Sequence, residues 1–173
     1  MDVAVAAAVV AASEFVSAGS SPAELPIEAV RARGGKIVAT GGCFDILHTG
    51  HARTLRAARS LGDFLVVCLN SDASVRRLKG PGRPVVGQED RRRVLEAMQC
   101  VDAVVVFDED TPEQVLRQVR PDVWAKGGDY AGVDLPETEV VAEWGGDVVV
   151  LPYLRGRSTT RLVRAATGGG GAA

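Results

Sequence analysis

The strongest constraint on the fold is an alternation of short, valine-rich apolar runs with segments of helical periodicity. The apolar runs lie at residues 37–39, 64–69, 103–107, 123–125 and 148–151. Helical patterns lie at 51–61, 89–98 and 112–119, with a weaker one at 136–144. Apolar runs of this length predict buried strands, and strands that alternate with helices predict a parallel sheet wound by right-handed crossovers. The expected fold class is α/β, a Rossmann-like parallel five-stranded sheet with helices on both faces.

The alternating pattern covers residues 36–166, which we expect to form one domain. Apolar residues recur at helical spacing between residues 5 and 16, and a second helical stretch ends near residue 33, so residues 1–35 are expected to be a helical extension. A signal peptide is not favoured, because Asp2 stands where basic residues should be, and the apolar stretch is too short to span a bilayer. The glycine-rich residues 167–173 are expected to form a flexible tail.

Charge and cysteine content exclude several classes of function. The formal net charge is -2 and the pI is about 5.7, so neither a general nucleic-acid binder nor a binder of acidic membranes is expected. The three cysteines are odd in number and lack C-x-x-C spacing, which argues against a disulfide framework and a zinc site. A reducing cytoplasm is the expected location.

The segment that most strongly indicates chemistry is 40–51, which follows the first expected strand and opens the next helix. Consecutive glycines let the main chain approach a phosphate, and amides at a helix N-terminus supply donors at the positive end of the dipole. His48 and His51 are the only histidines of the chain and lie three residues apart, on one face of the first helical turn. A structural pair of histidines stays an alternative, whereas a zinc site lacks a third ligand at matching spacing.

The residues His48-Thr49-Gly50-His51 resemble the HxGH motif of the cytidylyltransferase-like nucleotidyltransferase superfamily. From about residue 36 to 164 the chain is more closely similar to the adenylyltransferase domain of the ADP-heptose synthases, in four blocks that occur in the same order. The resemblance implies that His48 and His51 are catalytic and that Asp45 buttresses the loop. It further implies nucleotide contacts from Gly42, Cys43, Phe44 and Gly50.

The second block, residues 70–80 followed by Arg83-Pro84, resembles the family's NSD…RLKG…RP stretch. It opens a basic segment that contains Arg76, Arg77, Lys79, Arg83, Arg91, Arg92 and Arg93. Such a local positive excess in an acidic protein suits a polyphosphate clamp, although a solvated basic helix face is the alternative for several of these residues. The resemblance implies a catalytic role for Lys79 and nucleotide binding by Arg91.

Two further blocks follow the fourth and fifth expected strands. Residues 126–130 read KGGDY, and the resemblance implies nucleotide or sugar contacts from Lys126, Gly128 and Asp129. A tight Gly-Gly-Asp turn is the structural alternative. Residues 156–160 resemble the family's G-x-STT element, which implies nucleotide binding by Ser158, Thr159 and Thr160. A helix N-cap is the alternative for these hydroxyls, and both roles are compatible.

The resemblance implies transfer of AMP from ATP to a sugar 1-phosphate, D-glycero-β-D-manno-heptose 1-phosphate, which gives ADP-heptose and pyrophosphate. A sugar phosphate is already anionic near neutral pH, so the attack on the α-phosphorus needs aligned cations and donors more than a strong base. No carboxylate cluster predicts a metal cage, and Mg²⁺ is therefore expected to arrive with ATP.

Two other functions stay open. A cytidylyltransferase for glycerol 3-phosphate or another polyol phosphate shares the HxGH and STT elements, and a non-catalytic nucleotide-binding module would share the loop. In many members of the family this domain is fused to a sugar kinase. The 173 residues contain no kinase pattern, so a separate sugar kinase in the same pathway is the expected partner. The sequence leaves the oligomeric state open, a homo-oligomer included.

Overall fold

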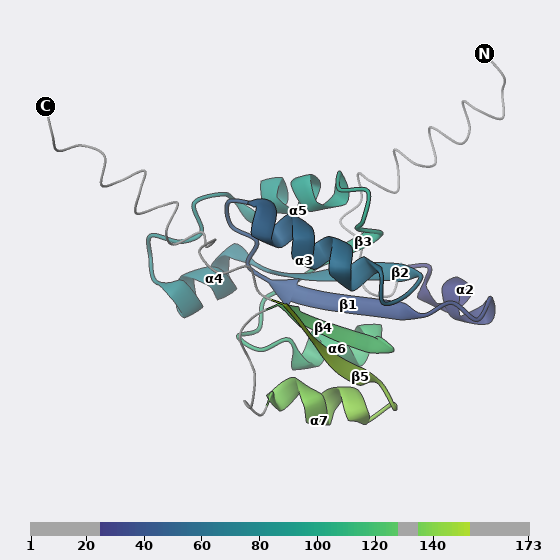
Figure 1. Cartoon of the computed structure of the whole chain (residues 1–173). Helices are drawn as coiled ribbons and strands as arrows, with labels where there is room; N and C mark the ends of the chain where they lie inside the picture. Colours follow the sequence, from purple (N-terminus) through teal and green to yellow (C-terminus); the bar gives the residue numbers. More distant parts are fainter. Residues whose placement is uncertain (1–24, 128–134, 153–173) are drawn as a thin grey trace, which may run out of the picture.

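The computed structural model describes residues 25–127 and 135–152 (Figure 1). Within these residues five strands form one sheet in the order β3-β2-β1-β4-β5, and every neighbouring pair is parallel. The strands are β1 (Ile37–Gly42), β2 (Phe64–Asn70), β3 (Ala103–Phe107), β4 (Val123–Gly127) and β5 (Asp147–Leu151). The α/β class and the parallel Rossmann-like sheet predicted from the sequence are confirmed.

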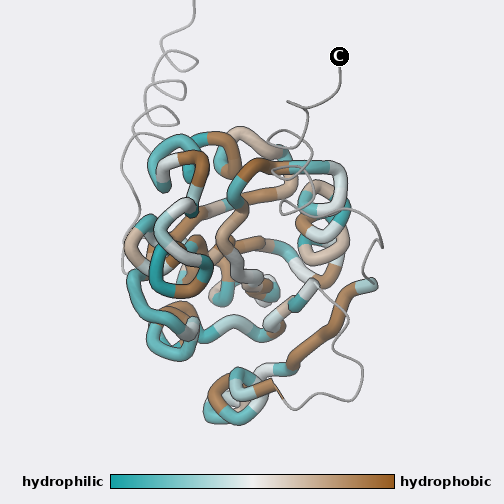
Figure 2. Tube along the Cα trace, turned by 90° about the vertical axis from the view of Figure 1, so that its left-hand side faces the viewer, coloured by the Kyte–Doolittle hydropathy of each residue, from teal (hydrophilic) through white to brown (hydrophobic). Residues whose placement is uncertain are grey.

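Helices cover both faces of the sheet, as Figure 1 shows. They are α2 (Ile27–Ala32), α3 (Thr49–Arg59), α4 (Asp72–Lys79), α5 (Gln88–Glu96), α6 (Glu113–Val119) and α7 (Pro136–Ala142). Side chains of α3 and α5 share one buried cluster with Val38, and those of α2, α6 and α7 share another with Ile37 and Ala39. Successive residues of β1 therefore face opposite layers. In Figure 2 apolar stretches run both through the middle of the fold and along its edge, where strand β5 is only partly buried. No helix in the described ranges is long and apolar enough to cross a membrane.

Helix α4 has no counterpart among the helices predicted from periodicity. It is only 8 residues long, and its buried side chains are those of Ser74 and Val75, so the apolar pattern is too short to stand out. A local signal was present nevertheless. Ser71 is the N-cap, and its side chain accepts a hydrogen bond from the amide of Ser74 at 3.0 Å.

Strands β1 and β4 are neighbours at the point where the strand order reverses. Their pairing consists of Val38 with Val123 and Ala39 with Trp124, whereas β1 pairs with β2 along its whole length. Beyond Ala39 the hydroxyl of Thr40 donates to the carbonyl of Ala125 at 2.7 Å in place of a backbone bond. Backbone pairing between the two strands thus stops before their carboxyl ends, which is where sheets of this order bind ligands.

Candidate active site

The loop that follows β1 has an unusual backbone. Phe44 and Ile46 have positive φ angles of 44° and 54°. Left-handed backbone is uncommon for residues other than glycine, and especially so for a β-branched residue such as Ile46. Gly42 lies below the Phe44 ring, since a Cβ there would be 3.3 Å from a ring carbon. The chain therefore makes a compressed turn between β1 and α3 that surrounding bonds must maintain.

The two histidines open α3 as a reciprocal cap. His48 is the N-cap residue, and its Nδ1 accepts from the amide of Gly50 at 3.1 Å. His51 returns the bond, because its Nδ1 accepts from the amide of His48 at 3.4 Å. The rings stack with centroids 3.9 Å apart and an interplanar angle of 21°. Since both Nδ1 atoms act as acceptors, each neutral ring carries its proton on Nε2 and can donate from that atom. The structural and catalytic interpretations of this pair are thus compatible.

The environment of His51 keeps its imidazole neutral. Burial is the main cause that lowers the pKa of His51 to about 4, and the nearby charges of His48 and Lys79 lower it further. The effect of Lys79 also shows that its ammonium lies within electrostatic reach of the histidine pair. Near neutral pH His51 is therefore a neutral donor beside a cationic side chain.

Asp45 holds the loop in place through the bonds of its side chain, as predicted. Its carboxylate accepts from the amides of Val85 and Val86 at 3.0 Å each and from Nε of Arg83 at 2.6 Å. Burial raises the pKa of Asp45, but these amides and the guanidinium more than offset that effect, so the pKa lies below its ordinary value. The loop is in this way bonded to residues 83–86, where the peptide bond between Arg83 and Pro84 is cis.

Arg91 connects the loop with the end of β2. Its side chain is 1% exposed, and Nη1 donates to the carbonyls of Cys43 at 2.6 Å and Asn70 at 2.9 Å. Nε donates to the carbonyl of Val86 at 2.9 Å, and Nη2 contacts Asp72 at 2.7 Å. Four of the five guanidinium donors are therefore used within the protein. Arg91 lies beneath the loop, which favours a positioning role over the nucleotide contact implied by the resemblance.

Most of the predicted basic clamp is paired internally. Ion pairs join Arg77 to Asp108 and Asp110, Arg83 to Asp45, Arg91 to Asp72, Arg92 to Glu89 and Glu96, and Arg93 to Glu89. Lys79, at the last turn of α4, has no carboxylate partner within residues 25–127 and 135–152. Arg76 of the same helix has no such partner among these residues either, but Lys79 is the one whose charge affects the pKa of His51, so it is the predicted cation best placed to meet an anionic ligand near the histidines.

The end of β4 forms a second side of the candidate site, in addition to the histidine loop. Lys126 bonds to Glu137 of α7, whose side chain is 7% exposed and whose second oxygen has no partner among the described residues. The sequence did not point to Glu137, because a glutamate in the first turn of a helix is ordinary. The other predicted members of this side, Gly128, Asp129, Ser158, Thr159 and Thr160, lie outside the described residues.

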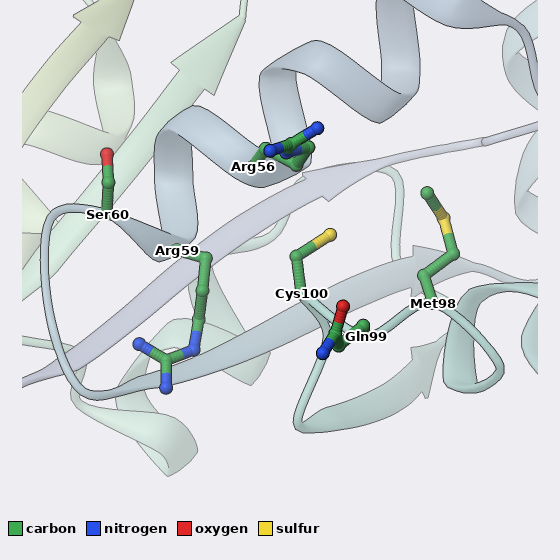
Figure 3. Close-up of a pocket in the computed structure, with 6 residues that line it drawn as sticks. All are labelled: Arg56, Arg59, Ser60, Met98, Gln99 and Cys100. Carbon is green, nitrogen blue, oxygen red and sulfur yellow. The ribbon is translucent and has the colours of Figure 1, made fainter.

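A separate groove of about 670 Å³ lies at the far end of α3 (Figure 3). It is lined by Arg56, Arg59, Ser60, Met98, Gln99 and Cys100. None of the predicted site residues lines it, and Arg59 is paired with Asp102 at 2.9 Å. It also adjoins the C-terminal end of α3, where the helix dipole disfavours anions. The chemistry of the histidines, Lys79 and the glycine loop thus lies at the opposite end of this helix.

Metal coordination by the protein has little support in the described ranges. No group of three or more His, Cys, Asp or Glu side chains there is arranged to hold an ion. The two carboxylates that adjoin the loop, Asp45 and Asp72, already contact Arg83 and Arg91. The donor set suits a polyanion that carries its own cation.

Comparisons with known proteins agree with this geometry. The family described as cytidylyltransferase-like matches residues 39–150. The bifunctional protein HldE of Streptomyces coelicolor is 57% identical over 185 positions, which cover 95% of this chain and 40% of that protein. The bifunctional protein HldE of Geobacter sulfurreducens is 52% identical over 137 positions, which cover 79% of this chain and 28% of that protein. The chain thus spans less than half the length of these relatives.

A solved structure extends the likeness to the fold. The crystal structure of the lipopolysaccharide core biosynthesis protein from Thermoplasma volcanium superposes with a TM-score of 0.57 at 27% identity, over 70% of this chain and 98% of that one. The family match begins inside β1 and ends inside β5, so it includes the histidine loop, Lys79 and the end of β4. On these grounds the chain belongs to the cytidylyltransferase-like family.

Proposed function

We propose that the chain is an adenylyltransferase that moves AMP from ATP to a sugar 1-phosphate and releases pyrophosphate. The proposed acceptor is D-glycero-β-D-manno-heptose 1-phosphate, and the product is then ADP-heptose. The observation that carries the proposal is the histidine pair, whose Nδ1 atoms are both engaged by backbone amides at the start of α3. The identity of 57% to a bifunctional protein HldE supports the heptose branch.

The geometry suits catalysis by alignment and charge stabilisation. With Nδ1 of His48 and His51 accepting from the backbone, their Nε2 donors would contact phosphate oxygens on which negative charge grows as the α-phosphorus is attacked. Lys79 would hold the leaving pyrophosphate. A neutral His51 is suited to this role, because it donates a proton in a hydrogen bond without transferring it.

The remaining predicted contacts follow from the same arrangement. The backbone at Gly42, Cys43, Phe44 and Gly50 would approach the triphosphate, while Arg91 fixes the Cys43 carbonyl from below. The amide of Gly50 already donates to His48, so Gly50 would act by allowing close approach of the main chain. The ribose and acceptor would be bound by Lys126, Gly128, Asp129, Ser158, Thr159 and Thr160.

We propose that Mg²⁺ enters bound to ATP, where it neutralises charge on the β- and γ-phosphates. The paired carboxylates Asp45 and Asp72 fit this arrangement, because neither is left to bind the ion alone. Chelation of magnesium should therefore abolish turnover without lowering the melting temperature of the ligand-free protein. A fall in that temperature would instead indicate an ion that is part of the fold.

The proposed setting is the cytoplasm, with a sugar kinase of the same pathway supplying the phosphorylated acceptor. The word bifunctional in the names of the relatives is compatible with such a second activity, since this chain aligns with only 40% and 28% of two of them. Association of the chain with itself stays part of the proposal and is checked by its mass in solution.

One experiment tests the function directly. ATP, CTP and GTP are each combined with heptose 1-phosphate, glucose 1-phosphate and glycerol 3-phosphate, and pyrophosphate release is measured. Release with ATP and heptose 1-phosphate is expected. Release only with CTP and glycerol 3-phosphate would move the chain to the polyol branch, and no release with any pair would favour a binding module without catalysis.

A further inference from the structure

Gly127, the last residue of β4, lies against helix α3. A Cβ built on Gly127 would be 2.7 Å from Cγ2 of Thr54 and 3.2 Å from its Oγ1. Such a contact is too short for any side chain larger than hydrogen. Gly127 has an ordinary backbone conformation, because it is not among the glycines with positive φ. Its glycine identity is thus explained by space and not by φ.

Thr54 connects this contact with the histidine turn. Its hydroxyl donates to the carbonyl of Gly50 at 3.1 Å, and the amide of Gly50 donates to Nδ1 of His48. Thr54 also lies one turn after His51, on the same side of α3. The methyl group of Thr54 therefore faces Gly127 at the end of β4, while its hydroxyl bonds to the backbone of the histidine turn at Gly50.

The position of this contact gives it a consequence for ligand binding. Strands β1 and β4 pair through their backbones only at Val38 and Ala39, and the next bond between them runs from the side chain of Thr40 to the carbonyl of Ala125. Helix α3 packs on β1 and β2 and also contacts β5 (Figure 1). Backbone pairing between β1 and β4 therefore does not extend to the histidine turn and the end of β4.

We infer that Thr54 and Gly127 form a spacer contact that sets the width of the nucleotide site between the histidine turn and the end of β4. Thr54 is thereby a positioning residue, and Gly127 is glycine so that the two sides of the site can approach to this distance. The inference rests on the proposed function, because it assumes that the gap between these sides receives the nucleotide. The contact between the two residues itself does not depend on that function.

A double-mutant cycle tests the spacer contact, with the dissociation constant of magnesium-ATP from calorimetry and kcat from pyrophosphate release as readouts. Gly127→Ala should widen the gap and weaken both parameters by roughly 10- to 100-fold, since small misplacements in a site have effects of this size. Thr54→Ala alone should weaken ATP binding only about threefold. The double variant should return to about the level of Thr54→Ala, because the methyl group and the hydroxyl that the new Cβ would meet are gone.

Gly62→Ala is the matched control. A Cβ at Gly62 would also be 2.7 Å from a side-chain carbon, that of Val38, but Gly62 lies at the opposite end of the sheet, before β2. This variant should lower the melting temperature and leave the ATP dissociation constant unchanged. An equal loss of ATP affinity in Gly62→Ala and Gly127→Ala would reduce the effect to general destabilisation and overturn the inference.

Two further outcomes separate the spacer from other roles of Gly127. If the double variant is as defective as Gly127→Ala, the glycine serves contact of its backbone with the nucleotide, and the spacer is rejected. If Gly127→Ala does not fold, Thr54→Val and Thr54→Ala are compared. Valine keeps a methyl group against Gly127 and should bind ATP within about twofold of wild type, whereas equal affinities in the two variants would reject the spacer.

Failure of the proposed function would be visible separately. A wild-type protein that binds magnesium-ATP but releases no pyrophosphate would contradict the adenylyltransferase proposal. The ATP affinities of the variants would in that case still test the spacer contact. A wild-type protein that does not bind ATP would overturn both.

Discussion

The two ends of the sheet differ in how often their carboxylates pair with arginine. At the amino end, Asp63, Asp102 and Asp122 each stand directly before a strand and accept a backbone amide from the neighbouring chain segment. These distances lie between 2.7 and 2.8 Å. This bond recurs at three strands and satisfies backbone amides where the strands begin. The carboxylates therefore stabilise the amino end of the sheet.

At the carboxyl end, both Asp45 and Asp72 are paired with arginines, Arg83 and Arg91, whereas of the three amino-end aspartates Asp102 alone has such a pair, with Arg59. Their negative charges are therefore compensated next to a loop that would otherwise repel a triphosphate. At the amino end the left-handed residues Gly34, Arg120 and Gly145 follow helices, whereas at the carboxyl end Phe44 and Ile46 are left-handed within the loop that leads to the two imidazoles at a helix start. We conclude that stability and ligand chemistry are separated along the strands, and variants at each end should show this.

The largest effect is expected for His51→Ala. Removal of one donor to the reacting phosphates should lower kcat by about 10²- to 10³-fold, or roughly 3 to 4 kcal/mol. Pyrophosphate release at saturating ATP measures it. Arg56→Ala, an exposed change in the same helix, is the control and should keep wild-type kcat. Near-normal turnover of folded His51→Ala would contradict a catalytic site at the carboxyl end of the sheet.

Arg91→Lys should come next and affect both stability and rate. Lysine keeps the charge but cannot reach the carbonyls of Cys43 and Asn70 and the carboxylate of Asp72 together, so the unfolding free energy should fall by about 3 kcal/mol, the range for broken buried ion pairs. Urea unfolding and kcat give the readouts. Arg92→Lys is the matched control, because Arg92 is equally buried but bonds only to Glu89 and Glu96 of its own helix. Equal losses of kcat in both variants would refute a positioning role for Arg91.

Asp102→Ala probes the amino end. The carboxylate accepts from the amide of Leu65 at 2.7 Å and pairs with Arg59 at 2.9 Å, so its loss should cost about 1 to 3 kcal/mol of unfolding free energy. The values of kcat and KM at a temperature where the variant is folded should not change. Asp147→Ala, at an exposed position, should stay within roughly 0.5 kcal/mol of wild type. A kinetic defect in Asp102→Ala would show that the two ends are coupled.

The sequence predicted the sheet, its parallel strands and most helices, because an apolar run such as 64–69 directly reflects the burial of that segment. It also predicted that Asp45 supports the loop. It did not predict α4, whose single buried hydrophobic residue, Val75, makes no periodic pattern. Local composition is informative where one face of an element is apolar, and it fails where a short helix begins from a capping serine.

The site residues show the same difference between features that are local in the sequence and features that the fold brings together. The histidine loop is visible in sequence because its members are contiguous, whereas the partners of Arg91 come from three separate segments. Charge alone suggested a phosphate clamp for Arg77 and Arg92, but Asp110, brought close by the fold, pairs with Arg77, and Glu96 in the same helix pairs with Arg92. The Thr54 contact with Gly127 joins residues 73 positions apart, and nothing local to either residue indicates it.

A pH dependence of stability is also expected from His51. Its folded-state pKa of about 4 lies below the ordinary value of 6.5, so the unfolded chain binds a proton that the folded protein excludes. The stabilisation from the neutral imidazole is complete above pH 6.5 and is lost as pH falls towards 4. Kinetically, turnover should not fall between pH 8 and 6 through protonation of His51.

His51→Gln isolates this contribution, because its amide side chain does not titrate. The unfolding free energy of wild type should decline more steeply than that of His51→Gln as pH is lowered from 6.5 to 4.5, the interval in which the unfolded histidine becomes protonated. Urea unfolding at four pH values compares the slopes, and Asp45, whose low pKa is common to both proteins, cancels in the difference. Parallel slopes would mean that His51 has the same pKa in the folded and unfolded states. Its imidazole would then become cationic as pH falls through about 6.5, and turnover would change in the interval where the lowered pKa predicts no change.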